Sequence, residues 1–388
     1  MTVSPLRLAL NENPYRPLPS VRDALRHDLA EVNRYPEFLP VVLPRLIAER
    51  VGMTPEEVVV GVGATGVALQ VLQALCKPGD SLVFAHPTFD GYPILADIAG
   101  LIQVPIPLAD NGMTDLDELL GAAYDADAAA LVLCRPHNPT GTLIPADQVY
   151  EFVRQAPPTS VVVLDEAYIE FVDPDEHLDI PGLLRLHPNL VVLRTFSKAY
   201  GLAGLRIGYG LAAPAVCGVI RRYQLPFGMN RAAAVAVAAS YAAEGELRVR
   251  VDSIVYERDR LRARLAQMGA HIPESHANFV YLPARGDGER WMSILGTGDV
   301  VAKEYSDGGV RLTVGDPREM AIVARRLLEV DEIGENAVSR MSRPGHRQVG
   351  RGDPSPRLPT PKRQGPSRST PTSSKCVAVV LRHISKGW

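Results

Sequence analysis

A lysine lies shortly after a strongly apolar run, beside two groups that could share its chemistry. The segment Val191–Gly210 reads VVLRTFSKAYGLAGLRIGYG, with Ser197 next to Lys198 and Arg206 eight residues further on. A lysine amine can form a Schiff base with an aldehyde, while hydroxyl and guanidinium groups bind phosphate. A lysine alone on a loop is usually a solvated surface residue, so the prediction depends on the three groups together. Their combination predicts an aldehyde cofactor that carries a phosphate, which is pyridoxal 5′-phosphate.

Two further strand-like runs end in residues that suit this cofactor. Residues 129–134 lead to Asn138, and residues 161–164 lead to Asp165 and Tyr168. An ionised aspartate beside the ring nitrogen keeps it protonated, so that the ring can accept electrons from a substrate. Asn138 and Tyr168 can hydrogen-bond the ring's 3′ oxygen. Two alternatives remain open, because Asp165 could cap a helix and Asn138 could be a turn residue.

A glycine-rich turn and an aromatic residue add weaker signals. Residues 57–61 read as a strand that runs into GVGATG at 61–66 and then into a helix. Backbone N–H groups at such a helix start form an anion site, although glycines there are as often steric relief. Phe89, in HPTFDGYP, can stack on a cofactor ring or can be an ordinary core residue.

The elements that must position these residues alternate between strands and helices. Short β-branched runs without clear alternation are typical of strands covered on both faces, and they lie at 81–84, 103–106, 129–134, 161–164 and 190–193. Helical patterns lie between several of them. The sequence therefore predicts a doubly wound α/β layer with its ligand beyond the carboxyl ends of the strands. The three strand ends that carry candidate cofactor-binding residues are expected to form one site there.

The flanking regions are expected to complete the structure. Leu8–Pro19 is predicted as an extended arm, Ser20 as the cap of a helix, and 42–51 as a second helix. Towards the other end, apolar periodicity predicts further helices near 232–243, 253–268 and 317–330 and strands at 278–281 and 309–314.

Composition argues against several classes of protein. A hydrophobic content of 46% and a net charge of −3 give no reason to expect nucleic acid as a partner of the main body. The four cysteines lack metal-site or disulfide spacing, so no metal is expected and a reducing cytoplasm fits. No apolar run approaches the roughly 18 residues that span a bilayer, so no membrane partner is expected.

Eight segments together carry a resemblance to a known family. They are LNENPY at 10–15, NRYP at 33–36, HPTFDGYP at 86–93, HNPTG at 137–141, LDEAYIEF at 164–171, TFSKAYGLAGLRIGY at 195–209, ANFV at 277–280 and VRLTVG at 310–315. From about residue 8 to about residue 328 the chain resembles the fold-type-I pyridoxal-phosphate aminotransferases. It is most similar to the histidinol-phosphate and aromatic amino acid aminotransferases. This implies a large doubly wound α/β domain with a mainly parallel sheet and a smaller α/β domain.

The resemblance implies roles for the matching residues. Lys198 would be the Schiff-base lysine and Asp165 would pair with the ring nitrogen. The remaining cofactor-binding residues would contact the 3′ oxygen, the ring face or the phosphate, and they are Asn138, Tyr168, Phe89, Ser197, Arg206 and the backbone N–H groups of Ala64 and Thr65. Tyr35 would reach the phosphate of the neighbouring subunit, which implies a homodimer with shared active sites.

Two residues are assigned to the substrate. Arg311 suits a bidentate grip on a carboxylate, with a surface arginine on an edge strand as the alternative. Tyr15 would line the substrate mouth. The implied reaction moves an amino group between histidinol phosphate or an aromatic amino acid and 2-oxoglutarate, with Lys198 as general base and acid. A decarboxylase of a phosphorylated amino acid is the enzymatic alternative, and a ligand-sensing regulator is the non-enzymatic one.

Three departures from the family's pattern bear on these expectations. The arm before LNENPY is short, which would weaken arm exchange between subunits. GVGATG lacks the usual serine hydroxyl and carboxylate. Lys303 stands where relatives often have an arginine for a substrate phosphate or carboxylate, and a lysine cannot form two forked bonds. These differences modestly favour aromatic or broader substrates.

Four segments are expected along the chain. Residues 1–32 form an arm and first helix that belong with the small domain, 33–230 form the large cofactor-binding domain, and 231–333 form the small domain. Residues 334–388 form a basic tail rich in Pro, Ser, Arg and Gly. This tail is expected to be disordered, because it has few apolar residues to offset the entropy of ordering, with nucleic-acid binding as the alternative.

Overall fold

The computed structural model describes residues 5–327, apart from 285–290, 292–294 and 296–299. Met1–Val338 form one compact unit, and the second unit, Ser339–Trp388, lies outside the described residues. The tail predicted at 334–388 therefore also lies outside them, as does the end of the helix predicted at 317–330, which is described over 317–327. The division of 1–333 into domains stays a prediction. In the described part of the chain, no helix is both long and apolar enough to cross a membrane.

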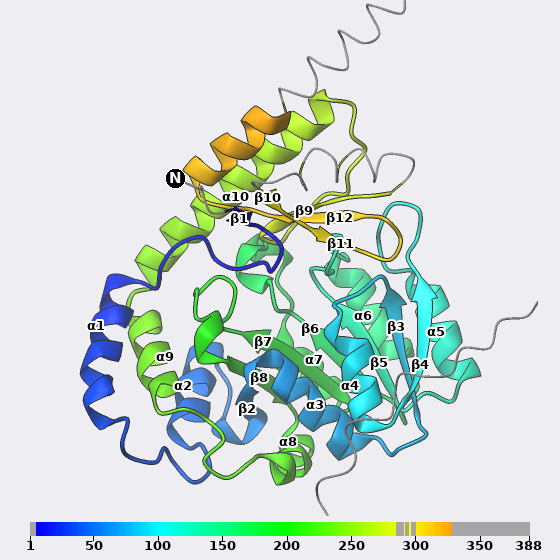
Figure 1. The fold of residues 1–388 in the computed structure, drawn as a ribbon. Coiled ribbons are helices and arrows are strands. Elements are labelled where there is room, and N and C mark those ends of the chain that lie inside the picture. Colours follow the sequence, from blue (N-terminus) through cyan, green and yellow to red (C-terminus); the bar gives the residue numbers. More distant parts are fainter. Residues whose placement is uncertain (1–4, 285–290, 292–294, 296–299, 328–388) are drawn as a thin grey trace, which may run out of the picture. The chain divides into compact units, whose positions relative to one another are not determined.

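Seven strands form the central sheet, in the order β2-β8-β7-β6-β5-β3-β4 (Figure 1). Their bounds are β2 Val58–Val62, β3 Ser81–His86, β4 Ile102–Pro107, β5 Ala130–Cys134, β6 Val161–Asp165, β7 Leu190–Thr195 and β8 Ile207–Ala212. Only β8 runs against the rest, antiparallel to both β2 and β7. The other neighbours pair in parallel, which confirms the predicted mainly parallel α/β sheet.

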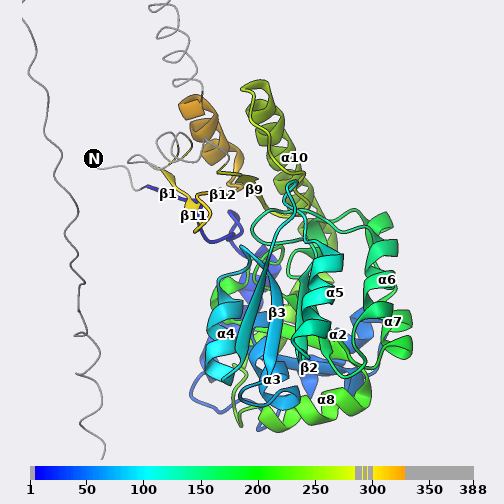
Figure 2. The same ribbon diagram turned by 90° about the vertical axis from the view of Figure 1, so that its right-hand side faces the viewer.

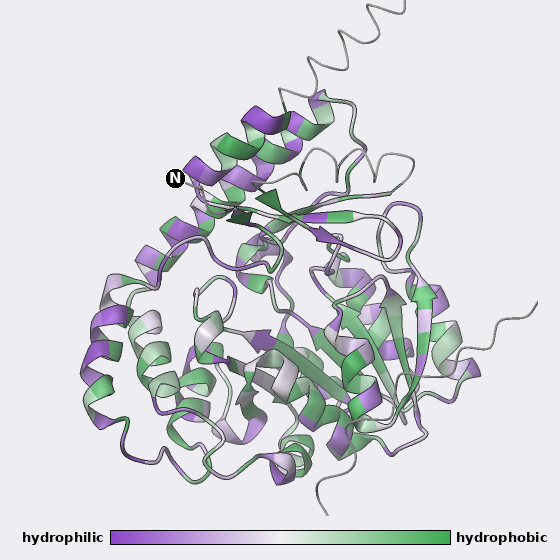
Figure 3. Ribbon diagram, in the orientation of Figure 1, coloured by the Kyte–Doolittle hydropathy of each residue, from purple (hydrophilic) through white to green (hydrophobic). Residues whose placement is uncertain are grey.

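Helices cover both faces of this sheet. The helices of the described residues include α1 Pro19–Asp28, α2 Val42–Val51, α3 Gly63–Leu75, α4 Gly91–Ala99, α5 Leu116–Asp125, α6 Ala146–Gln155, α7 Ile180–Leu186, α8 Pro214–Ile220, α9 Ala232–Ala242 and α10 Glu244–Gln267. Alternate strand residues enter different apolar clusters: Val59 packs with α3, α4 and α8, while Val58 and Val60 face the other side. Figure 2 shows α4 on one side of β3 and α6 and α7 on the other. The strands between them are mostly hydrophobic (Figure 3), as expected of a doubly covered layer.

Three local predictions are wrong. Residues 103–106 form a strand, but only one of the six residues of β4, Ile106, is buried, because β4 ends the sheet and pairs with β3 alone. Its prolines, Pro105 and Pro107, are typical of an edge strand. Ser20 does not cap α1, because Pro19 is already the first helical residue. Finally, α10 begins at Glu244 rather than near Ser253.

A second, smaller sheet lies beyond the carboxyl ends of the parallel strands (Figure 1). It is antiparallel, in the order β11 (Lys303–Glu304), β12 (Val310–Thr313), β9 (Phe279–Leu282). The N-terminal segment β1 (Leu6–Arg7) pairs with β10 (Val300–Val301). The arm then continues beside β12, where the Thr313 N–H donates to the Leu8 carbonyl at 2.8 Å. These contacts bring the predicted arm to the sheet ends.

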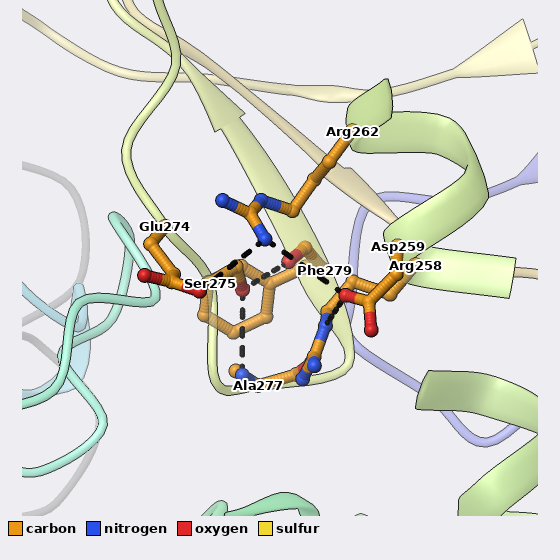
Figure 4. A network of polar contacts seen from close by, with 7 residues as sticks. All are labelled: Arg258, Asp259, Arg262, Glu274, Ser275, Ala277 and Phe279. Carbon is orange, nitrogen blue, oxygen red and sulfur yellow. Dashed lines mark hydrogen bonds and ion pairs between the residues drawn. The ribbon is translucent and has the colours of Figure 1, made fainter. Parts of the chain in front are cut away.

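Figure 4 shows the polar network that ties α10 to the chain entering β9. Arg262 forms ion pairs with Asp259 at 3.9 Å and with Glu274 at 3.7 Å. The Ser275 hydroxyl donates to the Phe279 carbonyl at 2.5 Å. The network thus fixes the start of β9, whose Phe279 ring then packs against the site described below.

Candidate active site

One cavity of about 340 Å³ lies between the carboxyl ends of the parallel strands and the smaller sheet. Ten of the residues predicted from the sequence line it, and they are Ala64, Thr65, Phe89, Asn138, Asp165, Tyr168, Ser197, Lys198, Arg206 and Arg311. The three strand ends that carry candidate cofactor-binding residues therefore converge on one cavity, as expected in a doubly wound α/β fold. Their individual roles stay predictions.

Lys198 is held at the cavity wall by the N-terminal arm. Its Nζ donates to the carbonyl oxygens of Leu10 and Asn11, each at 3.2 Å. Burial and the positive charge of Arg311 lower the pKa of Lys198 to about 8, against an opposing effect of Glu12. Because a neutral amine is the nucleophilic and proton-accepting form, Lys198 is far better suited to that work near neutral pH than an ordinary lysine.

Asp165 is the last residue of β6, and its buried carboxylate accepts two hydrogen bonds. Its Oδ2 accepts from the Tyr92 hydroxyl at 2.6 Å, and its Oδ1 accepts from the Ala167 N–H at 3.0 Å. Burial raises the pKa of Asp165, and these two hydrogen bonds oppose the rise. The helix-cap alternative is wrong, since the next helical turn, Ile169–Phe171, has Tyr168 at its N-cap.

The start of α3, Ser197 and Arg206 lie together at the cavity and could hold an anion, so we call this group the anion cradle. The Arg206 Nη1 donates to the Ser197 hydroxyl at 3.4 Å, and the Gly63 N–H donates to the Arg206 carbonyl at 3.0 Å. The N-terminal N–H groups of α3, at Ala64 and Thr65, carry the positive end of the helix dipole. A Cβ on Gly208 would lie 2.0 Å from the Ala64 nitrogen, so only glycine lets β8 come this close.

Arg311 is buried, with 6% of its surface exposed, in the middle strand of the smaller sheet. The surface alternative for this residue is therefore wrong. Its Nη1 donates to the Asn138 Oδ1 and, at 2.6 Å, to the Tyr305 hydroxyl, while Nη2 donates to the Ala9 carbonyl at 2.6 Å. Its buried Nε has no hydrogen-bond partner among the described residues. The guanidinium thus presents its positive charge to the cavity, and the hydrogen-bond partners that hold it are uncharged.

Tyr168 is fixed by a residue that sequence reasoning left unassigned. Its hydroxyl accepts from the Asn11 side-chain amide at 2.9 Å, and Asn11 also accepts a hydrogen bond from Thr313 at 3.1 Å. The Tyr168 ring lies edge-on to Phe279, with 5.1 Å between centroids. Burial raises the pKa of Tyr168 to about 12, so its hydroxyl stays protonated. Asn11 belongs to the LNENPY motif, which was the only available signal.

Two aromatic residues lie together in the cavity wall. Phe89 and Tyr92 both line the cavity and meet edge-to-face, with centroids 5.9 Å apart. Tyr92 was not among the predicted site residues. Its position in HPTFDGYP gave no sign that it would bond Asp165, because that contact joins α4 to β6 across the fold.

Two predicted residues lie outside the cavity lining. Tyr35 is 80% exposed, and its ring packs on Phe227 with 4.7 Å between centroids. Tyr15, expected at the substrate mouth, instead packs on α10, where its hydroxyl shares a 2.8 Å hydrogen bond with Ser253. Arg250 lies over the same ring at 5.9 Å. The α10 side chains therefore hold Tyr15 away from the cavity of its own chain.

Comparisons with known proteins agree on one family. A model of the family described as aminotransferase class I and II matches residues 4–327. Aromatic amino acid aminotransferases of Rhodococcus jostii and Cutibacterium acnes are 41% and 42% identical to the chain over 314 and 310 residues. These matches cover 81% and 80% of the chain and 87% and 88% of the relatives. A crystal structure of histidinol-phosphate aminotransferase from Sinorhizobium meliloti in complex with pyridoxal-5′-phosphate superposes with a TM-score of 0.79 at 29% identity, covering 85% of this chain and 91% of that one.

Proposed function

Because the chain belongs to the aminotransferase class I and II family, we propose that it is a transaminase dependent on pyridoxal 5′-phosphate. It transfers an amino group between an aromatic amino acid, or histidinol phosphate, and 2-oxoglutarate. The observation that carries the proposal is the position of Lys198, whose pKa is lowered to about 8, in the same cavity as Asp165 and the anion cradle.

The residues of the cavity fit this cofactor. The α3 N-terminus, Ser197 and Arg206 supply donors and positive charge for its phosphate. Asp165 supplies a carboxylate for the ring nitrogen, and Asn138 and Tyr168 supply polar groups for the 3′ oxygen. Phe89 would offer a flat face to the ring, and Lys198 would supply the amine that holds the cofactor's aldehyde. When bound, the cofactor supplies a ring that accepts electrons from the substrate's Cα.

The chain's own groups then orient the substrate and move its proton. Arg311 binds the substrate carboxylate through a guanidinium whose Nε is still unpartnered in the described structure. Lys198 Nζ, with a pKa of about 8, takes the Cα proton and later returns one at little cost near neutral pH. The carbonyls of Leu10 and Asn11 hold this amine in place.

Aromatic donors are favoured over histidinol phosphate. Relatives at 41% and 42% identity are aromatic amino acid aminotransferases, whereas the histidinol-phosphate enzyme of known structure is 29% identical. Lys303 at the cavity wall is a single point charge rather than a forked arginine, which makes a weaker phosphate site.

A homodimer with shared active sites is part of the proposal. Large apolar side chains are exposed around Tyr35, and they include Phe38 at 60%, Val41 at 48%, Leu225 at 70% and Phe227 at 42%. Patches of this kind mark protein interfaces. In the dimer, Tyr35 would reach the phosphate of the partner's cofactor. The free cysteines Cys76, Cys134 and Cys217 support a reducing, cytoplasmic location.

The test is a transamination assay on the cofactor-loaded protein. Phenylalanine, tyrosine and histidinol phosphate are each supplied with 2-oxoglutarate, and glutamate and the keto product are measured. We expect stoichiometric glutamate and keto product, with the highest kcat/KM for an aromatic donor and no turnover in Lys198→Ala. Release of carbon dioxide without a keto product would instead identify a decarboxylase and overturn the proposal.

A further inference from the structure

The cationic side chains of the cavity differ in how their charge is compensated. Arg311 is buried and, among the described residues, forms no ion pair with a carboxylate. Lys303 lines the same cavity, but its Nζ lies 2.8 Å from the Asp90 Oδ2. The side chains of Lys303 and Asp90 are 36% and 54% exposed, so this pair lies at the open side of the cavity. The cavity therefore has an uncompensated cation at its buried wall and a compensated one at its rim.

Asp90 does not form the hydrogen bond that is usual for an aspartate at its position in a helix. It is the N-cap residue of α4, a position at which the carboxylate normally accepts a hydrogen bond from the next turn of the helix. No such hydrogen bond forms here, and the carboxylate instead reaches across to Lys303 of β11. Lys303 is further steadied by the Tyr305 ring, whose centroid lies 5.4 Å from Nζ.

We propose that Asp90 is a specificity-determining residue that weakens, without preventing, the binding of substrates with a charged distal group, the acceptor 2-oxoglutarate included, relative to aromatic substrates. The inference rests on the proposed function, because it takes Arg311 as the site of the substrate carboxylate. An uncharged aromatic ring at the rim leaves the Lys303–Asp90 pair intact. A phosphate or a second carboxylate must take Lys303 away from Asp90 and then lie beside the Asp90 carboxylate.

The size of this effect follows from the exposure of the pair. Exposed ion pairs are weak, so exchanging Asp90 for a substrate anion is possible but carries a measurable penalty. Replacing Asp90 by asparagine removes both the competing partner and the repulsion. We expect ligands with a distal anion to bind about two- to five-fold more tightly to Asp90→Asn. Ligands with an uncharged distal group should bind unchanged.

Two unreactive ligands separate these cases without any turnover. Glutarate carries a second carboxylate, whereas 3-phenylpropionate carries a phenyl ring, and neither has an amino or keto group. Their dissociation constants are measured by calorimetry on the cofactor-loaded protein. The variants are Asp90→Asn, Lys303→Met, the double variant, and Asp97→Asn as a control. Asp97 lies on the same helix, accepts a hydrogen bond from the Gln103 side chain and does not line the cavity.

The expected pattern is specific to the pair. Asp90→Asn tightens glutarate alone, Lys303→Met weakens glutarate alone, and Asp90→Asn no longer tightens glutarate once Lys303 is methionine. Asp97→Asn changes neither ligand. If Asp90→Asn shifts both ligands equally or leaves glutarate unchanged, while 3-phenylpropionate binds normally, this inference is overturned and the proposed function stands. If neither ligand binds to the wild-type protein, the proposed function and the inference both fail.

Discussion

At the scale of single residues, the chemistry depends on hydrogen bonds that no single motif contains. Asp165 receives its strongest contact from Tyr92, on a different element, and Tyr168 receives its contact from Asn11 in the arm. Burial raises the pKa of Asp165 and of Tyr168, and each of these hydrogen bonds opposes the rise. The site is therefore a set of motif residues tuned by neighbours from elsewhere in the chain.

Tyr92→Phe tests this tuning. The Tyr92 hydrogen bond lowers the pKa of Asp165, so its removal raises that pKa further and leaves less ionised carboxylate for the cofactor ring. We expect cofactor affinity to fall about ten-fold, the cost of one hydrogen bond to a charged group. Equilibrium titration with pyridoxal 5′-phosphate measures the change. Tyr281→Phe, which breaks an equal 2.6 Å bond to Asp307 away from the cavity, is the matched control and should bind normally.

Sequence reasoning reached some of these residues and not others for a physical reason. Lys198, Asp165 and Asn138 stand at the ends of strands, where local pattern predicts both the strand and its exposed tip. Tyr92, Asn11 and Tyr305 reach the cavity only through long-range packing of α4, the arm and the turn after β11. No local pattern encodes those contacts.

At the scale of elements, the contact between β8 and the start of α3 decides whether the anion cradle exists. Gly208→Ala would place a Cβ 2.0 Å from the Ala64 nitrogen, and a backbone atom cannot move aside cheaply. We expect the α3 N-terminus to shift, with at least a ten-fold loss of cofactor affinity and a lower melting temperature.

The matched control for this change is Gly218→Ala. Gly218 lies inside α8, and a Cβ there would meet nothing within 4 Å. Alanine also favours the helix by about 0.5–1 kcal/mol, so this variant should bind the cofactor normally and melt at the same temperature or higher. Unchanged cofactor binding in Gly208→Ala would show that the cradle does not depend on this approach.

The elements themselves were largely predictable, and the errors have identifiable causes. Residues 129–134 and 161–164 are apolar enough to indicate buried parallel strands, and they form β5 and β6. β4 was misjudged because apolar content does not reveal a strand's place in the sheet order. The early start of α10 was missed because its first turns are strongly polar.

At the scale of the whole molecule, buried charge beneath the site links stability to pH. Arg194 pairs with the fully buried Glu166 at 2.7 Å. Glu170, four residues further along the chain in the short helical turn Ile169–Phe171, has a buried Oε2 with no hydrogen-bond partner in the described structure. Burial raises the pKa of Glu170 to about 7, and Arg194 only partly offsets this.

The sign of the pH effect follows from that rise. Between the ordinary carboxyl pKa of 4.5 and about 7, the folded state keeps a proton on Glu170 that the unfolded state has lost. The contribution of Glu170 to stability therefore falls as pH rises through this window, and the penalty is constant above it. We expect Glu170→Gln to be more stable than wild type at pH 8 by on the order of 2 kcal/mol, with most of the gain absent at pH 5.

Thermal melts at both pH values measure this difference. Glu151→Gln is the control, because the Arg154 and Gln155 hydrogen bonds lower the pKa of Glu151 to about 2 and it exchanges no proton between pH 5 and 8. A stability difference between wild type and Glu170→Gln that is equal at pH 5 and pH 8 would contradict the assignment.

The most direct test of the account is covalent trapping of the cofactor. The protein is mixed with pyridoxal 5′-phosphate at pH 6 to 10, reduced with borohydride at timed intervals, digested and analysed by mass spectrometry. We predict an adduct on Lys198, with a rate of attachment that rises with pH and levels off above a midpoint of about 8. An adduct confined to another lysine such as Lys303, or no adduct at any pH, would contradict it.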